Sequence, residues 1–265
     1  SLTAMGLKVT PINNGKRVST LNDTFSSMLL TPMKDDDVLK LIGTDKEVVS
    51  ARKHMAKKDG EDAAEKGGLF DPDIFGTDDK ETRNRWGYIK LNHPVPNPIL
   101  MADPQYNPYA ELTPFKASEL KKIMEENVVV IINPGDTNFK KDQIVKASEV
   151  DKAEAEGKLV EYKVGGEAIM HYLKKVDLDK EMRDTESRLR TTTDSKERDR
   201  LYKKYRMLSS LKKNGLNPTD LMTKIVPVVP VYMRPRIQQG KGVITYDLNK
   251  LYGEIINTNN ATAYT

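Results

Sequence analysis

The sequence predicts an α+β fold with short strands, proline-rich loops and one long antiparallel helical hairpin. Three observations lead to this prediction. The run VVVII at residues 128–132 consists of β-branched side chains, which favour a buried strand. Fourteen prolines divide the chain into short elements, because proline is not tolerated inside a helix. Residues 179–213 hold two stretches with helical spacing around three threonines, which predicts a helical hairpin.

The composition excludes several classes of protein. The 265 residues allow one large domain or two smaller ones. Hydrophobic residues make up 37% and the mean hydropathy is -0.62, so the core is modest and we expect a partner to complete part of the surface. No run of about 18 apolar residues occurs, and the start SLTAMGLKVT lacks the features of a signal peptide. We therefore expect no membrane partner and a cytoplasmic location.

The chemistry of the side chains is also restrictive. The sequence has no cysteine, which excludes disulfides, thiol catalysis and thiolate metal sites. His54, His93 and His171 lie far apart, so we predict surface or packing roles for them. Phosphate-binding loops, dinucleotide fingerprints and nucleophile elbows are missing. Asp71 and Asp73 are a weak cation site, because loop aspartates beside proline usually cap turns. We predict no catalytic residue, metal or cofactor in this chain.

The first half of the chain contains short elements. Residues 1–32 show no clear periodicity and are set apart as an N-terminal segment, whereas residues 33–265 form one module. MKDDDVLKLI predicts a helix with three aspartates in its first turn, where the helix dipole favours them. Consecutive helical residues point in different directions, so the triplet is a poor metal site. Residues 50–68 are a polar surface excursion, and GLFDPDIFG is a tight, partly buried loop.

The middle of the chain alternates strands and helices. We predict a strand at Trp86–Leu91, a loop with three prolines, a helix at Ala117–Glu126 and the strand at 128–132. The sequence NPGD breaks that strand sharply. Residues 144–175 contain helical material that is interrupted by glycines.

The hairpin is the clearest unit. Its helices are Asp179–Arg190 and Lys196–Lys213. Asp194 precedes Glu197 by three residues, a pattern similar to a capping box. The pair Asn214-Gly215 is predicted to end the second helix.

The net charge of +4 is unevenly distributed. Residues 174–213 contain 14 Lys or Arg and 8 Asp or Glu, a surplus of six, so the rest of the chain sums to -2. A basic helical surface of this kind could face phosphates. The alternative is a solvated hairpin with alternating charges.

The last unit is a stiff loop followed by a helix. Prolines and glycines exclude a helix from its first half, and Asp247 is predicted to cap a helix with an apolar stripe. Arg234 and Arg236 flank a proline and lead into Gln239-Gly240-Lys241-Gly242. Such a basic loop could lie along nucleic-acid strands. The alternative is an ordinary hairpin tip with solvated charges.

The same unit resembles the largest (β′) subunit of bacterial-type multisubunit DNA-directed RNA polymerase. That family reads roughly V-L-P-V-L-P-P-x-L-R-P, then a glycine-bearing loop, then S-D-L-N-x-L-Y-x-x-[VI]-I-N-x-N-N. This chain has IVPVVPVYMRP, QQGKG and TYDLNKLYGEIINTNN. GLFDPDIFG, RWGYIKLNHPV, VVVIINPGDTNFKKDQI and GGEAIMHYLKKVDLDKE are similar to further segments in the same order. The resemblance covers most of residues 65–260.

The resemblance implies a clamp-type module, the N-terminal clamp portion of β′, which in that family grips DNA and the RNA–DNA hybrid. Loop 236–246 corresponds to the lid, which helps to separate RNA from template DNA. Residues 247–260 begin the first clamp helix, where an initiation factor docks. The implied nucleic-acid-binding residues are Arg234, Arg236, Gln239, Lys241, Arg52 and Lys53, the last two from a zipper-like region. The implied docking residues are Asp247, Asn249, Tyr252 and Asn257.

The chain departs from the family in two ways. Only Thr77–Asn84 separates Gly76 from Arg85, where the family carries a four-cysteine zinc ribbon, so we expect no zinc. After Asn260 the family continues to the N-A-D-F-D-G-D loop that holds the catalytic magnesium, whereas this sequence ends in ATAYT. Either β′ is encoded in separate pieces or this sequence is a truncated part of it. In the first case, the missing zinc ribbon and the split resemble the large subunits of giant bacteriophages. Magnesium is then expected in a partner chain, and the cytoplasm would be that of the host.

These observations predict a non-catalytic subunit portion of the polymerase, which is a nucleotidyltransferase. Its partners would be the remaining β′ piece, β-like chains, DNA, RNA and an initiation factor. The alternative function is a helical adaptor that binds a protein partner through the 179–213 hairpin.

Overall fold

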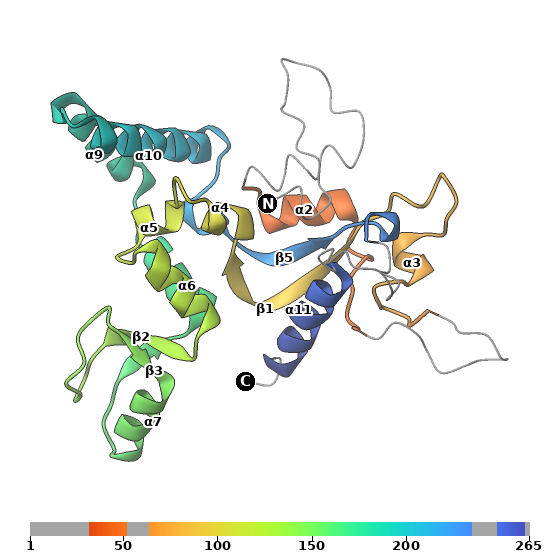
Figure 1. Ribbon diagram of the computed structural model, residues 1–265, viewed down its shortest axis with the longest axis horizontal. Helices are drawn as coiled ribbons and strands as arrows, with labels where there is room; N and C mark the ends of the chain where they lie inside the picture. The colour runs from red at the N-terminus through yellow and green to blue at the C-terminus, as the bar shows by residue number, and fades with distance from the viewer. Residues whose placement is uncertain (1–31, 52–63, 235–247, 263–265) are drawn as a thin grey trace, which may run out of the picture. The chain divides into compact units, whose positions relative to one another are not determined.

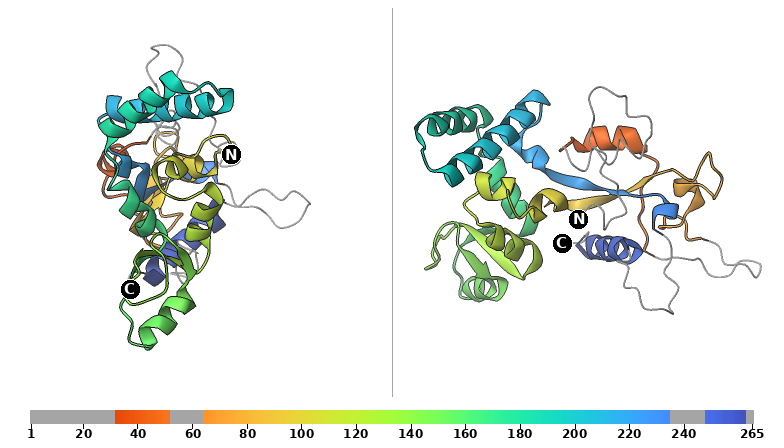
Figure 2. Two further views of the ribbon diagram at one scale, coloured as in Figure 1. Left: turned by 90° about the vertical axis from the view of Figure 1, so that its left-hand side faces the viewer. Right: turned by 45° about the horizontal axis from the view of Figure 1, so that its top comes forward.

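The computed structural model describes residues 32–51, 64–234 and 248–262. The chain divides into two compact units, one made of residues up to Asn92 and from Lys224 onward, the other of His93–Thr223. Figures 1 and 2 show the elements of both. Most of the N-terminal segment and the lid-like loop 236–246 lie outside the described residues. So do several single residues for which the sequence predicts a role: Arg52, Lys53, His54, Arg236, Gln239, Lys241 and Asp247.

The first unit contains the helix that the aspartate triplet predicts. This helix, α2 (Asp35–Ile42), has all three aspartates in its first turn, which confirms the prediction. The Asp35 carboxylate also accepts a hydrogen bond of 2.9 Å from the backbone N–H of Lys224. Lys224 belongs to β5 (Met222–Val228), which pairs with β1 (Gly87–Pro96) in a two-stranded sheet. The triplet therefore places negative charge at the start of its own helix, and Asp35 also binds the neighbouring strand.

The GLFDPDIFG segment contains a short helix, α3 (Pro72–Phe75), inside the predicted loop. The Asp71 carboxylate is buried and accepts the N–H groups of Asp73 at 2.9 Å and Gly67 at 2.7 Å. It thereby satisfies two backbone donors, as an N-cap does. This first unit also contains the 3-10 turn η2 (Val231–Met233) and the helix α11 (Leu248–Thr262).

The proline-rich stretch differs from its prediction. Pro94 and Pro96 lie in β1, where we expected a loop; a strand in a two-stranded sheet has a free edge that needs no N–H donor. Pro98 begins the helix α4 (Pro98–Ala102), at a position where the missing N–H costs nothing. The Asn97 side chain caps this helix by accepting the N–H of Ile99 at 2.9 Å.

The second unit contains a three-stranded antiparallel sheet in the order β3–β2–β4. The central strand β2 (Val128–Asn133) is the predicted β-branched strand, and its first four residues are buried. Its partners are only three residues long: β3 (Ile144–Lys146) and β4 (Glu161–Lys163). The helix α7 (Ala147–Ala155) follows β3 directly. We had predicted helical material interrupted by glycines in residues 144–175. The helix α7, which ends before Gly157, confirms part of that prediction, whereas the two short strands were not predicted.

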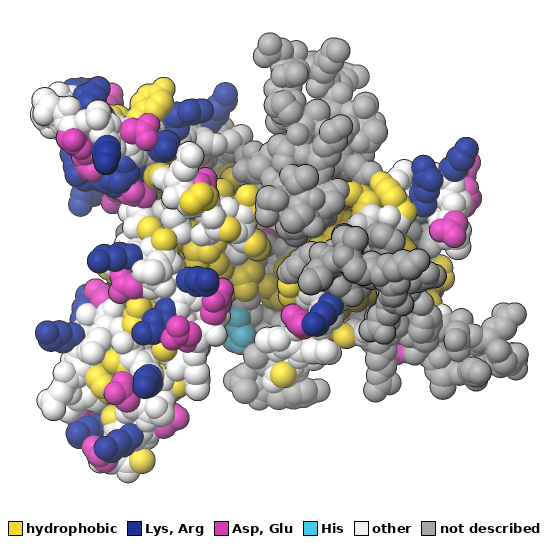
Figure 3. All heavy atoms as spheres, viewed as in Figure 1, with side chains coloured by type: hydrophobic (Ala, Val, Ile, Leu, Met, Phe, Trp, Pro, Cys, Tyr) yellow, Lys and Arg dark blue, Asp and Glu magenta, His cyan; other side chains and the backbone are white. Residues whose placement is uncertain are grey.

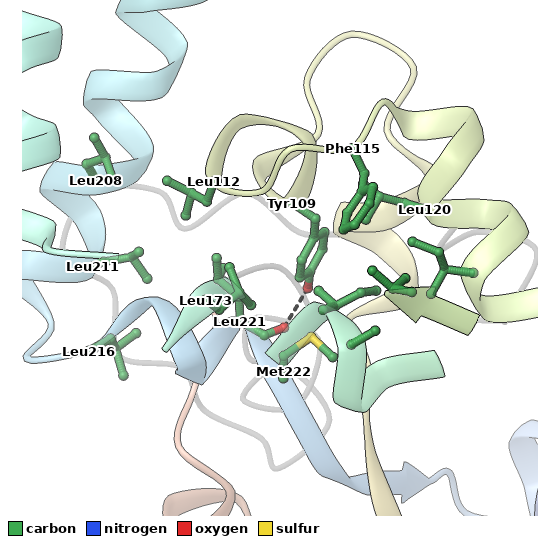
Figure 4. Packing of buried hydrophobic residues seen from close by; sticks show 14 residues of the cluster. Tyr109, Leu112, Phe115, Leu120, Leu173, Leu208, Leu211, Leu216, Leu221 and Met222 are labelled. Carbon is green, nitrogen blue, oxygen red and sulfur yellow. Dashed lines mark hydrogen bonds between the residues drawn. The ribbon is translucent and has the colours of Figure 1, made fainter. Parts of the chain in front are cut away.

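A larger hydrophobic core joins the other helices of the second unit. Its side chains come from α5 (Pro108–Leu112), α6 (Ala117–Glu125), α8 (Gly165–Leu173), α10 (Ser195–Lys213) and the 3-10 turn η1 (Pro218–Leu221). Figure 4 shows Tyr109 within this core, with its hydroxyl directed at the carbonyl of Leu221. The approach of α8 to β1 is close, because a Cβ on Gly166 would lie 1.6 Å from the carbonyl oxygen of Pro94.

The hairpin is confirmed as α9 (Leu178–Thr191) and α10 (Ser195–Lys213). Asp194 caps α10 by accepting the N–H of Glu197 at 2.9 Å, as predicted. On α10, Leu201, Leu208 and Leu211 are at most 2% exposed, and the last two belong to the hydrophobic core of the unit. Within the described ranges, none of the helices is both long enough and apolar enough to span a membrane.

Candidate nucleic-acid interface

Arg234 was predicted to contact nucleic acid, and the structure corrects this prediction. The side chain is 2% exposed. Its guanidinium donates to the carbonyl of Val229 at 2.9 Å, to the Asn249 amide oxygen at 2.8 Å and to the carbonyl of Leu69. The group also lies over the ring of Phe75, 4.5 Å from its centroid. Burial lowers the pKa of Arg234 to about 10. This arginine holds the fold together and is not available to phosphates.

Two of the predicted docking residues are also buried. Asn249 is 4% exposed, and its amide nitrogen donates to the carbonyl of Arg234 at 2.9 Å. Tyr252 is 2% exposed, and its hydroxyl lies between the N–H of Val229 and the carbonyl of Pro227, at 3.4 and 3.3 Å. Burial raises the pKa of Tyr252. These side chains fix α11 to its own unit. Asn257 is exposed on the same helix and stays a docking prediction.

The asparagines of the INTNN sequence have a role that sequence reasoning missed. The Asn259 side chain accepts the N–H of Asn92 at 2.8 Å and donates to the carbonyl of Lys90 at 2.9 Å. Asn260 donates to the carbonyl of Val49 at 3.3 Å. A carboxamide carries both a donor and an acceptor, so Asn259 satisfies the edge of β1 as a neighbouring strand would. The repeated asparagines in this sequence were the available signal.

Ion pairs account for much of the charge of the hairpin. Six of the 14 basic side chains in residues 174–213 lie within 4.0 Å of a carboxylate. Arg200 contacts both Glu197 and Glu111, which ties α10 to α5. Lys204 is nearly buried and reaches Glu181 on α9 at 3.1 Å. These pairs set the register of the two helices. They also involve most of the acidic side chains of the hairpin.

Eight basic side chains remain without an ion pair in the part of the chain that the structure describes. They are Lys174, Lys175, Lys180, Arg183, Lys196, Arg198, Arg206 and Lys213. No acid occurs between Arg200 and Lys213 in the sequence. Figure 3 shows Lys and Arg side chains gathered over the hairpin. The surplus that the sequence predicted is therefore an uncompensated surface charge.

Part of this surplus forms a stripe on the exposed face of α10. We name Arg198, Tyr202, Arg206 and Lys213 the α10 stripe; these residues recur at helical spacing and all are exposed. Arg198 and Lys213 are 15 residues apart, which corresponds to about 22 Å along the helix. Tyr202 is 56% exposed, and the guanidinium of Arg206 lies 5.9 Å from its ring centroid. Asp199 on the same face is bonded to Lys203 at 3.0 Å.

The stripe matches what a nucleic-acid backbone requires. Exposed cations at intervals can meet successive phosphates without reading the bases. An exposed aromatic ring adds a surface on which a base can stack. Arg198 is less available than the others, because its guanidinium already donates to the carbonyls of Leu189 and Thr192 at 2.6 and 2.9 Å.

Metal ligands do not converge in the described part of the chain: no three His, Asp or Glu side chains are placed to hold an ion. His93 is exposed and lies 3.5 Å from Glu167. Burial, with help from Lys175 and Lys163, lowers the pKa of His171. Both histidines have the surface and packing positions that we predicted.

Comparison with known proteins identifies the family of this chain. Residues 44–264 match the family described as RNA polymerase Rpb1, domain 1. The DNA-directed RNA polymerase subunit beta' of Lactobacillus helveticus is 32% identical over 227 residues and is matched by 74% of this chain. The subunits of the same name from Lactobacillus acidophilus and Caldicellulosiruptor saccharolyticus are also 32% identical, over 74% and 69% of this chain. The chain spans 16–18% of the length of these relatives.

Proposed function

Since this chain belongs to the family of RNA polymerase Rpb1, domain 1, the N-terminal region of the largest (β′) subunit, we propose that it is a clamp portion of a multisubunit RNA polymerase. In this role it holds DNA and the RNA–DNA hybrid and does not itself carry out nucleotidyl transfer. The catalytic magnesium belongs to a partner chain. The partners are the other polymerase chains and nucleic acid.

The observation that carries the proposal is the α10 stripe. The hairpin keeps most of its acids in internal ion pairs and leaves cations and one tyrosine exposed on α10. Contacts of this kind depend on phosphate charge, so the binding is independent of sequence and weakens strongly with salt. That is the behaviour expected of a module that holds DNA while it moves.

Four finer assignments belong to the same proposal. Loop 236–246 acts as a lid at the upstream edge of the hybrid through Arg236, Gln239 and Lys241, and Arg52 and Lys53 face upstream DNA. The exposed face of α11, with Asn257, docks an initiation factor. The absence of cysteine, and with it of the zinc ribbon, supports a β′ subunit of the giant-bacteriophage type.

The salt dependence of DNA binding tests the proposal. We would change Arg206 and Lys213 to Gln together in the full chain and measure its affinity for a fluorescent DNA duplex by anisotropy from 50 to 200 mM salt. Each lost phosphate contact lowers the slope of log affinity against log salt by about 0.9. The double variant should therefore lose about 1.8 from the slope.

A matched control comes from the same helix. Asp199→Ala with Lys203→Ala removes one ion pair and leaves the net charge unchanged, so its slope should equal that of the parent chain. An unchanged slope in the Arg206/Lys213 variant, or an equal loss in the control, would overturn the assignment of the α10 stripe.

A further inference from the structure

A cleft of about 460 Å³ opens on the second unit, where three of its elements meet. Its walls are the end of α5 with the turn that follows it, the last turn of α8 and the first turn of α9. Apolar side chains form part of these walls, among them Leu112, Pro114 and Val176. None of the lining residues belongs to the α10 stripe. The cleft is therefore separate from the surface on which the proposed DNA binding depends.

Three carboxylates line the cleft, and each of them already has a partner. Glu111 lies 2.5 Å from Arg200, and Glu181 lies 3.1 Å from Lys204. Asp177 caps α9 by accepting a backbone N–H at 3.1 Å. Two of the three negative charges are thus neutralised by cations that lie outside the cleft lining.

Two lysines line the same cleft without such a partner. Lys175 and Lys180 are exposed, and neither forms an ion pair with any of the residues that the structure describes. The ammonium nitrogen of Lys175 lies 6.0 Å from the ring centroid of Tyr172, which is a weak contact. Against the two lysines stands only the charge of Asp177. The cleft therefore has a surplus of positive charge beside apolar walls.

This combination fits an acidic protein segment better than a small molecule or nucleic acid. Small-molecule sites enclose most of their ligand, whereas the charged side chains of this cleft are exposed to solvent. A nucleic-acid backbone would bring phosphates onto Asp177, which has no ion pair among the described residues. A peptide can direct its carboxylates at the two lysines and its apolar side chains at Pro114 and Val176, as charge-complementary protein interfaces do.

We propose that the cleft docks an acidic segment of the polymerase that lies outside this sequence. Lys175 and Lys180 meet its carboxylates, while Pro114 and Val176 contact its apolar side chains. The sequence spans 16–18% of the length of its relatives, so most of a β′-like subunit lies outside it and can supply such a segment. The inference rests on the proposed function only in taking the partner to be part of the polymerase.

Photo-cross-linking in the assembled polymerase tests the docking directly. The photoreactive residue p-benzoylphenylalanine replaces Pro114, which is exposed in the cleft wall, and mass spectrometry identifies the cross-linked peptide. We expect a peptide from outside this sequence that contains more Asp and Glu than Lys and Arg. Val176 is the second position, used if the Pro114 variant does not assemble. Lys152 on α7 lies outside the cleft, so the same substitution there should not yield this peptide.

Charge reversal then tests the role of the two lysines. Lys175→Glu with Lys180→Glu should lower the cross-link yield about tenfold or more, because like charges then face each other. The matched control is Lys121→Glu with Lys122→Glu on α6, which changes the net charge equally outside the cleft and should leave the yield unchanged. Changing two acids of the cross-linked peptide to Lys should restore the yield in the reversed variant.

Several outcomes contradict the proposal. Cross-links to DNA or RNA, to a peptide without an acidic surplus, or to nothing at all would overturn it, and so would equal losses in the two charge-reversed variants. Such a failure leaves the proposed function intact, because DNA binding by the α10 stripe is measured on the free chain. If the stripe variants keep the full salt dependence while Pro114 cross-links as expected, the docking stands and the DNA assignment fails.

Discussion

The substitution Tyr109→Phe removes one hydroxyl oxygen from the core of the second unit. It tests how much a buried hydrogen-bonding group contributes to the free energy of unfolding. Tyr109 is fully buried, and its hydroxyl donates to the carbonyl of Leu221 at 2.5 Å. The same oxygen accepts the N–H of Asn97 at 2.8 Å. Burial raises the pKa of Tyr109 well above its usual value, so the hydroxyl stays neutral and able to donate. Tyr109→Phe keeps the ring in the core and leaves two backbone groups without their partner.

The size of the effect follows from those two groups. An unsatisfied buried donor or acceptor costs about 1–3 kcal/mol. The Leu221 carbonyl is buried, whereas Asn97 is half-buried and can recover part of its loss from water. We therefore expect Tyr109→Phe to lower the free energy of unfolding by about 2–4 kcal/mol. Since the packed ring is retained, the change in surface exposed on unfolding should be small.

Urea denaturation followed by circular dichroism measures this change. The midpoint should fall while the slope of free energy against urea stays constant, because that slope follows the surface exposed on unfolding. Tyr205→Phe is the control: Tyr205 is half-buried on α10, and its loss of a hydroxyl should change the free energy by less than about 0.5 kcal/mol. Equal effects in the two variants would refute the argument that the Tyr109 hydroxyl joins α4 to η1.

Two further variants probe the same unit. Gly166→Ala should prevent normal folding, because the new Cβ would lie 1.6 Å from the Pro94 carbonyl oxygen; a native thermal midpoint would contradict the close approach of α8 to β1. His171→Gln should flatten the dependence of stability on pH. The folded pKa of His171 is lowered, so below about pH 6.5 the unfolded chain binds a proton more readily and stability falls. A parent chain with equal urea midpoints at pH 7.5 and 5.5 would exclude this contribution.

The elements predicted well from the sequence are those that local signals define. The α2 helix has its three first-turn aspartates, β2 has five consecutive β-branched residues, and α10 has Asp194 at its start. Each signal lies within a few residues of the element it defines. Helix dipole, side-chain branching and capping act over one turn or one strand, so they can be read without knowing the tertiary contacts.

The elements that were missed depend on distant partners. β3 and β4 are three residues long and exist because they pair with β2, with Val129 opposite Val145 and Ile131 opposite Tyr162. Their own sequences have no alternation long enough to identify a strand. The prolines of β1 were read as a loop for the same reason, since only the pairing with β5 shows that this segment is a strand.

The prediction for Arg234 failed because charge alone does not decide where a side chain lies. Arg234 and Arg206 are both arginines beside a methionine in basic segments. Arg234 donates to three oxygen acceptors in the interior. Arg206 lies over an aromatic ring and is exposed to solvent. Unmet carbonyls of loops can recruit an arginine as readily as a phosphate does, because both offer oxygen acceptors. A sequence shows the donors but not the carbonyls that compete for them.

The same competition ranks the cations of the α10 stripe. To bind a phosphate, Arg198 must give up its bonds to the carbonyls of Leu189 and Thr192, which end α9. Arg206 gives up only a weak contact with Tyr202, and Lys213 has no ion pair with any of the residues that the structure describes. The loss of two hydrogen bonds offsets much of the gain from one phosphate contact. Arg206 and Lys213 should therefore contribute most of the salt dependence, while Arg198 mainly keeps the connection between the two helices closed.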